Sequence, residues 1–193
     1  MTDTNYFVIE CFAEVGDAQI TTKPILPKGY DNWYAADIIP DNTIQEPLEH
    51  IIEAEHEGEM RPFFKALSAP LMSESMISVL KSSGVDNLQV FDAVVKVDQT
   101  GEVIQSYKAV NIVGLIEVAD LGESEYEVSP LDESPMYSTS FESLVVDEEK
   151  ANGALFFRMA ESVDTILVHK SVKEALETLF PRLDFIEPED YSN

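Results

Sequence analysis

The sequence predicts an α+β fold in which a mainly antiparallel sheet is combined with a few short helices. Three observations carry this prediction: two Ser-led amphipathic stretches, several strand-length runs of β-branched and aromatic residues, and a glycine that divides the longest run as a hairpin turn would. Hydrophobic residues make up 45% of the 193 residues, and no Gly- and Ser-rich linker divides the chain. We therefore expect one domain over residues 1–193, with residues 1–64 as its least defined part.

The N-terminal third is predicted to contain one strand and one helix. Residues 6–13 form a short aromatic and apolar run, which is typical of a strand. Residues 21–42 carry several prolines and a glycine and are expected to form an irregular connection. Pro47 suits the first turn of a helix over residues 47–58. The apolar stripe of this helix would consist of Leu48, Ile51 and Ile52.

Two further helices are indicated by serine caps. The first would begin at Ser73 or Ser75 and end at the following glycine. The second would begin with a capping box, in which the Ser171 hydroxyl and the Glu174 carboxylate satisfy free backbone N–H groups, and it would end before Pro181.

The remaining apolar runs are predicted to be strands. The longest runs form a hairpin, because a turn with Gly101 separates two β-branched stretches. The expected strands cover residues 88–98, 102–118, 143–147, 154–159, 164–170 and 183–188. Residues 120–140 are rich in Ser, Pro and Glu and are expected to form a long loop. A strand, a Ser-capped helix and a second strand occur twice, at residues 70–95 and 164–187, which suggests two similar supersecondary units.

The composition is strongly acidic. Asp and Glu number 37 against 12 Lys and Arg, which gives a formal net charge of -25. Nucleic acids and anionic membranes are bound mainly by Lys and Arg that replace phosphate counterions, so neither is expected as a partner. A basic or neutral partner is expected, and attraction to a basic one would weaken as the salt concentration rises.

The acidic residues are concentrated in two segments. Residues 41–59 hold seven acidic residues and residues 109–149 hold eleven, and neither segment contains Lys or Arg. Charges at this density must face solvent or a partner. Each segment is therefore a candidate for an interaction surface.

A cytoplasmic location is expected. The N-terminus has no basic region of the kind that begins a secretory signal peptide, and no run approaches the roughly 20 apolar residues that span a bilayer. The single cysteine, Cys11, cannot form an intramolecular disulfide, which fits a reducing compartment.

No arrangement of residues predicts catalysis, so the chain is not expected to be an enzyme or to hold a cofactor or metal. Cys11 lies within an apolar run, where a small buried side chain is the usual role. His50, Glu53 and His56 are three residues apart on the predicted helix, and they would at best approximate a shared metal-binding face. We interpret this spacing as accidental.

Three other side chains are candidates for contacts. Trp33 and Tyr34 could anchor an interface, although the interpretation that Trp33 fills the core is favoured. Arg158 lies in a predicted strand and is expected to pair with a carboxylate inside the fold, although an interface role stays open.

Four segments follow one another in an order that is known from other proteins. They are LMSESMISVLKSSGVDNLQVF, SYKAVNIVGLIEVAD, LFFRMAES and VHKSVKEALE. They correspond to a Ser-led helix, an extended pair with a Tyr and the dipeptide VN, an aromatic strand with FR, and a second Ser-led helix. In this order the chain resembles a family of bacterial immunity proteins that are encoded beside polymorphic toxins. The resemblance covers about residues 65–187 and leaves the N-terminal third outside it.

The resemblance implies a cytoplasmic protein that binds and neutralises a cognate toxin, and it supplies no catalytic residues. The acidic composition independently agrees with a basic toxin domain, because opposite charges speed encounter and favour one partner over others. We expect the toxin interface to include residues from both acidic segments, namely Glu49, Glu53, Glu57, Glu123, Glu125, Asp132 and Glu133.

Two alternatives stay open. The chain could be a non-catalytic interaction or regulatory module that forms homo-oligomers, or an enzyme with a carboxylate-based or metal-dependent site that no motif reveals. A large toxin gene next to this one would favour immunity. Metal analysis, together with a thermal shift on adding a chelator, would expose a metal enzyme.

Overall fold

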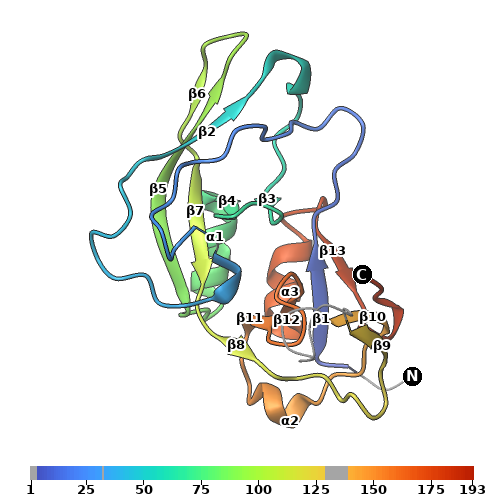
Figure 1. Ribbon diagram of the computed structural model, residues 1–193. Coiled ribbons are helices and arrows are strands. Elements are labelled where there is room, and N and C mark those ends of the chain that lie inside the picture. The colour runs from blue at the N-terminus through green and yellow to red at the C-terminus, as the bar shows by residue number, and fades with distance from the viewer. Residues whose placement is uncertain (1–3, 32, 129–138) are drawn as a thin grey trace.

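The computed structural model describes residues 4–31, 33–128 and 139–193, and it has the predicted α+β fold (Figure 1). The strands are β1 (Tyr6–Glu10), β2 (Leu48–Ile52), β3 (Phe63–Phe64), β4 (Leu71–Ser73), β5 (Leu88–Val97), β6 (Val103–Ile104), β7 (Tyr107–Ile112), β8 (Leu115–Ile116), β9 (Glu125–Val128), β10 (Thr139–Ser143), β11 (Phe156–Met159), β12 (Ile166–His169) and β13 (Asp184–Ile186). The α-helices are α1 (Glu74–Ser82), α2 (Glu148–Ala151) and α3 (Lys170–Glu177), and short 3₁₀ helices are η1 (Trp33–Ala35), η2 (Ala54–His56) and η3 (Pro188–Asp190). Within these described ranges no helix has the length and apolarity needed to cross a bilayer.

The strands lie mainly in two sheets. The larger sheet has the order β2-β5-β7-β4-β3, with β6 paired to the outer part of β5. The second sheet has the order β13-β1-β12-β11-β8, and β9 pairs with β10 in a separate ribbon. Neighbours are antiparallel except for the parallel pairs β2 with β5 and β11 with β8. The prediction of mainly antiparallel pairing is therefore confirmed, while its division into two sheets was not foreseen.

The two similar supersecondary units predicted at residues 70–95 and 164–187 are present. In the first, α1 joins β4 to β5, and the antiparallel strand β7 lies between these two strands. In the second, α3 joins β12 to β13, and β1 lies between them in the same way. Each unit is thus a strand–helix–strand arrangement split by a strand from outside it, which follows the unit closely in the case of β7 and comes from the other end of the chain in the case of β1.

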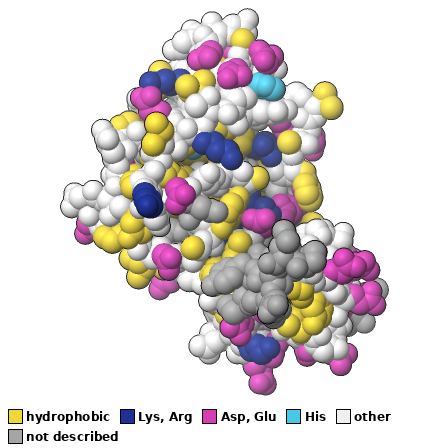
Figure 2. Space-filling view, in the orientation of Figure 1, with side chains coloured by type: hydrophobic (Ala, Val, Ile, Leu, Met, Phe, Trp, Pro, Cys, Tyr) yellow, Lys and Arg dark blue, Asp and Glu magenta, His cyan; other side chains and the backbone are white. Residues whose placement is uncertain are grey.

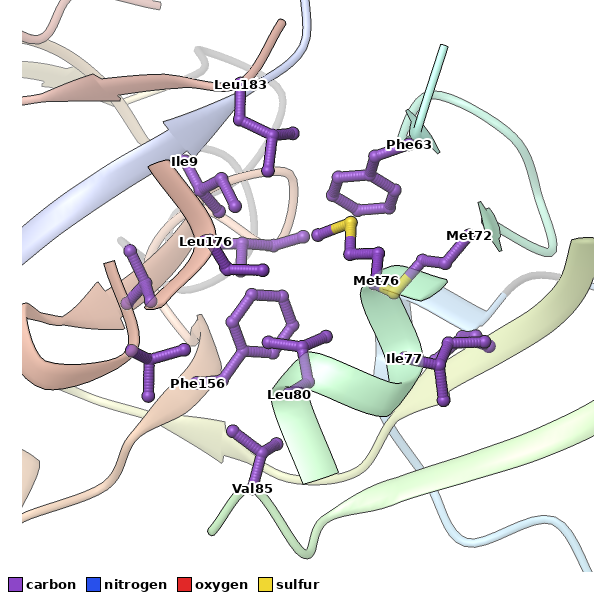
Figure 3. Close-up of a cluster of buried hydrophobic side chains, with 14 of the residues drawn as sticks. Ile9, Phe63, Met72, Met76, Ile77, Leu80, Val85, Phe156, Leu176 and Leu183 are labelled. Atoms are coloured by element: carbon purple, nitrogen blue, oxygen red, sulfur yellow. The ribbon is translucent and has the colours of Figure 1, made fainter. Parts of the chain in front are cut away.

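A shared core joins the two sheets at the place where α1 and α3 pack together (Figure 3). Both helices turn an apolar face inward, and strands of both sheets complete the cluster. The buried side chains that point toward one another include Ile9, Phe63, Met76, Leu80, Phe156 and Leu176. Burial of one such side chain stabilises the fold by roughly 1.5–3 kcal/mol. The cluster therefore contributes much of the free energy that holds the two sheets together.

The helix starts follow local signals, with one correction. The Ser73 hydroxyl accepts a hydrogen bond from the Met76 N–H at 3.3 Å, so the predicted cap of α1 is confirmed. The predicted capping box of Ser171 and Glu174 is wrong, because His169 is the N-cap of α3 and its Nδ1 accepts from the Ser171 N–H at 3.2 Å. Strand β12 runs directly into the helix, so the last residue of the strand is the one that caps it.

The helix predicted over residues 47–58 is wrong, because this segment forms β2 followed by η2. The side chains that face the core alternate along the strand, and they are Leu48, His50 and Ile52 rather than a helical stripe with Ile51. β2 pairs in parallel with β5 along its whole length. This pairing joins residues more than 40 positions apart in the sequence, and it overrides the local apolar spacing.

Several strand boundaries also differ from prediction. β1 ends before residue 11, and the expected long arm over residues 102–118 is divided into β6, β7 and β8, the last of which crosses to the second sheet. The expected loop over residues 120–140 contains β9 and the start of β10, with residues 129–138 outside the described part of the chain. The strand expected at residues 143–147 contributes only its first residue to β10, and α2 was not predicted.

Candidate functional site

The first predicted acidic group surrounds the end of β2. Glu49 is exposed, and its Oε1 lies 2.7 Å from the Nζ of Lys96. Glu53 is exposed at the start of η2, whereas Glu57 at the end of η2 is half-buried, with one inaccessible carboxylate oxygen that has no hydrogen-bond partner among the described residues. Of these three side chains, Glu53 presents its charge to solvent most directly.

The second predicted acidic group lies at β9. Glu123 and Glu125 are exposed, and Glu125 is the first residue of the strand. Asp132 and Glu133 lie outside the described residues. Figure 1 places β9 at the opposite end of the molecule from β2, so the two acidic groups do not form one compact patch.

An acidic cleft of about 350 Å³ adjoins this second group, and it opens between residues 144–148 and 187–189. Its apolar lining consists of Leu144, Val145, Val146 and Pro188, its carboxylates belong to Glu148, Glu187 and Glu189, and Thr4 completes it. The Val145 N–H donates to the hydroxyl of Ser124 at 2.9 Å. Because Ser124 stands between the two predicted glutamates, this bond places the β9 group directly beside the acidic cleft.

Hydrogen bonds hold the walls of the acidic cleft in place. The Leu144 N–H donates to the Pro188 carbonyl at 3.1 Å and ties η3 to the end of β10. The Asn5 backbone N–H and Nδ2 donate to the two oxygens of Glu148 at 2.8 and 2.7 Å. The negative charge of Glu148 also contributes, after burial, to raising the pKa of Tyr6. The cleft is therefore built before any ligand arrives.

Sequence reasoning missed most of this cleft. Glu148 belongs to the second basic-free segment, which was its only signal. Glu187 and Glu189 lie outside that segment, and nothing in their local sequence shows that the C-terminal segment returns to lie beside β10.

Basic side chains are largely engaged in ion pairs within the fold. Among pairs in which both residues are described, seven Lys and Arg have a nitrogen within 4.0 Å of a carboxylate oxygen, namely Arg61, Lys65, Lys96, Lys108, Lys150, Lys173 and Arg182. Figure 2 shows Lys and Arg mainly in the middle of one face, while acidic side chains gather at its top and lower right. On this face, negative charge is therefore least balanced at these two places.

A buried ionic cluster joins the N-terminal segment to the chain after α3. The carboxylate of Asp17, which is 7% exposed, accepts hydrogen bonds from Arg182 at 2.7 and 3.1 Å, and it lies 3.7 Å from the Nε of Arg61. The hydrogen bonds from Arg182 lower the pKa of Asp17. This cluster stabilises the fold and leaves little of its charge to a partner.

No carboxylate of the described residues forms an ion pair with Arg158, so that prediction is wrong. The side chain is fully buried, its Nη1 donates to the Val163 carbonyl at 2.6 Å, and its guanidinium carbon lies 4.8 Å from the centre of the Tyr34 ring. Burial lowers the pKa of Arg158 to about 10. A carbonyl and an aromatic face take the place of the expected anion, and its burial also removes it from any outer interface.

Trp33 and Cys11 are both core residues. Trp33 is 3% exposed and its Nε1 donates to the Tyr30 carbonyl at 3.1 Å, which confirms the interpretation that it fills the core. Burial raises the pKa of the Cys11 thiol. A raised pKa disfavours the thiolate that nucleophilic catalysis would need.

The spacing of His50, Glu53 and His56 does not produce a shared face. His50 points into the core from β2, whereas the other two belong to the turn that follows. Ligand atoms of Glu53, Glu55 and His56 do lie within 4.8 Å of one another. Exposed acidic turns often bring such atoms together without binding an ion, so we assign no metal site to them.

Comparison with known proteins identifies the family. A search of curated proteins found no match to the chain. A family model described as an immunity protein family, Imm11, matches residues 12–192. This match includes most of the N-terminal third. The resemblance inferred from the sequence began only at about residue 65, and this boundary is therefore corrected. Since the match spans nearly all of the sequence, the chain belongs to the Imm11 immunity protein family.

Proposed function

We propose that this immunity protein binds a cognate toxin in the cytoplasm and neutralises it by covering a basic toxin domain, such as a nuclease, with an acidic surface. The family match over residues 12–192 carries the proposal. The net charge of -25 supports the basic character of the partner. No covalent step is required, because occlusion of the active site is enough to stop a toxin.

Charge would act first on the rate of encounter. A strongly acidic protein attracts a basic one over a distance set by the salt concentration, which raises the association rate at low salt. After encounter, carboxylates can occupy the positions at which a basic active site holds the phosphates of its substrate. The same attraction would select against acidic proteins as partners.

Two acidic regions are candidates for the contact. The β2 region offers Glu49, Glu53 and Glu57, and the β9 region offers Glu123 and Glu125, to which we add Asp132 and Glu133 from the sequence. Because these regions lie at opposite ends of the molecule, we propose that one of them makes the principal contact. If charge reversal at Glu53 and Glu57 left the affinity for the toxin unchanged, the β2 region would be excluded from the interface.

A growth experiment tests this function. The toxin domain encoded beside this gene would be produced in a bacterial host alone, together with this protein, or together with an unrelated protein of similar negative charge. We expect growth arrest in the first and third cultures and normal growth in the second. Continued arrest with soluble immunity protein present would contradict the proposal. An unchanged mass of the recovered toxin would support binding over covalent inactivation.

A further inference from the structure

We propose that the acidic cleft between residues 144–148 and 187–189 is the anchor site for the toxin, and that it receives the side chain of one Arg or Lys of the toxin. The inference rests on the proposed function. It goes further by naming the surface that binds and the chemical group that this surface recognises.

The lining of the cleft matches the two parts of a long basic side chain. Val145 and Val146, which are partly exposed, offer apolar surface on which the methylene groups of Arg or Lys can pack, above the buried Leu144 and Pro188. Glu148 and Glu187 place carboxylates around the same space, where they can accept hydrogen bonds from a guanidinium or ammonium group. A cleft that was lined by carboxylates alone would not distinguish such a side chain from a small cation.

The cleft is the right size and is already formed. Its volume of about 350 Å³ lies at the lower end of the ~300–1,000 Å³ that is typical of protein ligand sites. The bidentate contact from Asn5 to Glu148 and the bond from Leu144 to Pro188 fix both walls. Little ordering is then needed on binding, which favours affinity.

The surroundings favour this end of the molecule over the β2 end. Residues 139–149 and 187–190 together contain seven acidic residues. Lys150 lies 3.6 Å from the carboxylate of Asp147, and at the β2 end Lys96 lies 2.7 Å from Glu49, so each end has one neighbouring lysine, and what sets this end apart is the formed cleft. The acidic cleft also lies beside the β9 group, because Val145 of its lining is hydrogen-bonded to Ser124. Charge complementarity thus commits this surface to a basic protein partner.

The test compares matched charge reversals. The purified toxin domain would be titrated into the wild type and into Glu187→Lys, Glu148→Gln and Glu53→Lys, with Glu187→Gln as a milder variant at the first site. We expect Glu187→Lys to weaken binding by about 30-fold or more, mainly through faster dissociation, and Glu53→Lys to weaken it by less than about 3-fold. Circular dichroism and thermal melts would verify that each variant is folded.

The outcomes separate this inference from the proposed function. Tight binding by the wild type with equal losses for Glu187→Lys and Glu53→Lys would mean that only overall charge matters, and this would overturn the anchor site. Tight binding that all variants retain would overturn it as well, while leaving the function intact. Absence of binding by the wild type would overturn the function itself. Double-mutant cycles would combine Glu187→Gln with alanine variants of the toxin's Arg and Lys residues. A toxin residue whose effect on the binding free energy is not additive with that of Glu187→Gln would support the anchor site directly.

Discussion

Replacing Gly58 by alanine should destabilise this protein strongly, because the backbone of another segment lies against it. A Cβ atom at this position would be 2.2 Å from the Gly16 carbonyl oxygen, 2.6 Å from the Asp17 carbonyl carbon and 2.7 Å from the Ala18 nitrogen. All three are backbone atoms, so no rotation of a side chain can make room. The two segments must move apart.

The size of the effect follows from what holds these segments together. To restore an ordinary contact of 3.4 Å, the chains must separate by about 1 Å. The Glu59 N–H donates to Gly16 and the Ala18 N–H donates to Glu59, both at 2.9 Å, and a shift of this size breaks both bonds. With about 1 kcal/mol for each bond and a similar amount for disturbing the buried Asp17, we expect a loss of about 2–4 kcal/mol. For a chain of 193 residues this lowers the melting temperature by roughly 5–10 °C.

Differential scanning calorimetry of Gly58→Ala beside Gly122→Ala provides the assay and its control. Gly122 faces only a side-chain atom, Asp120 Oδ1, at 3.3 Å, and this atom can move aside. The control should therefore lose less than about 0.5 kcal/mol. If both variants melted within about 2 °C of each other, the packing of the N-terminal segment against Gly58 described here would be refuted.

Three further predictions concern stability. Burial lowers the pKa of His50 to about 4, whereas in the unfolded chain this side chain takes up its proton near pH 6.5. The free energy of unfolding should therefore fall as the pH drops from about 6.5 to about 4, by at most ~3 kcal/mol from this group. In urea denaturation, His50→Leu should lose less stability over this pH range than the wild type, and an identical loss in both proteins would count against the prediction. Asp17→Asn should lower the free energy of unfolding by about 2 kcal/mol or more, because it leaves Arg182 and Arg61 without their buried anion. Glu49→Gln breaks an exposed pair and should lower it by less than about 0.5 kcal/mol. Equal urea midpoints for the two variants would contradict the value for Asp17. Because the two sheets share one core, near-ultraviolet and far-ultraviolet dichroism should report one coincident unfolding transition, and two separate transitions would argue against a single domain over residues 1–193.

Elements with strong local signals were predictable from the sequence. α1 has a serine cap, an apolar face and a terminal glycine within one short segment, and its prediction is confirmed. β2 has an apolar spacing that suits a helix equally well, and only its pairing with the distant strand β5 decides its conformation. The single-sequence pattern also could not show that His50 is the residue that faces the core. Prediction failed where non-local pairing, rather than local propensity, selects the structure.

The chemistry of the surface was easier to predict than its shape. The charge balance and the basic-free segments follow directly from counting residues, and they indicated where carboxylates such as Glu123 would be concentrated. The acidic cleft depends on the return of residues 187–189 to the end of β10, which is a tertiary contact. Arg158 illustrates the same limit, because the carbonyl of Val163 and the ring of Tyr34 meet its guanidinium only in the folded chain.

The central claim is that this protein neutralises a basic toxin by binding it through acidic surface. The most direct measurement is a calorimetric titration of the purified toxin domain, at low and at physiological salt, with toxin activity assayed at each ratio. The account predicts a defined complex, loss of toxin activity in proportion to the complex formed, and weaker binding at the higher salt concentration. A toxin that stays fully active in excess immunity protein, or an affinity that is unchanged by salt, would contradict it.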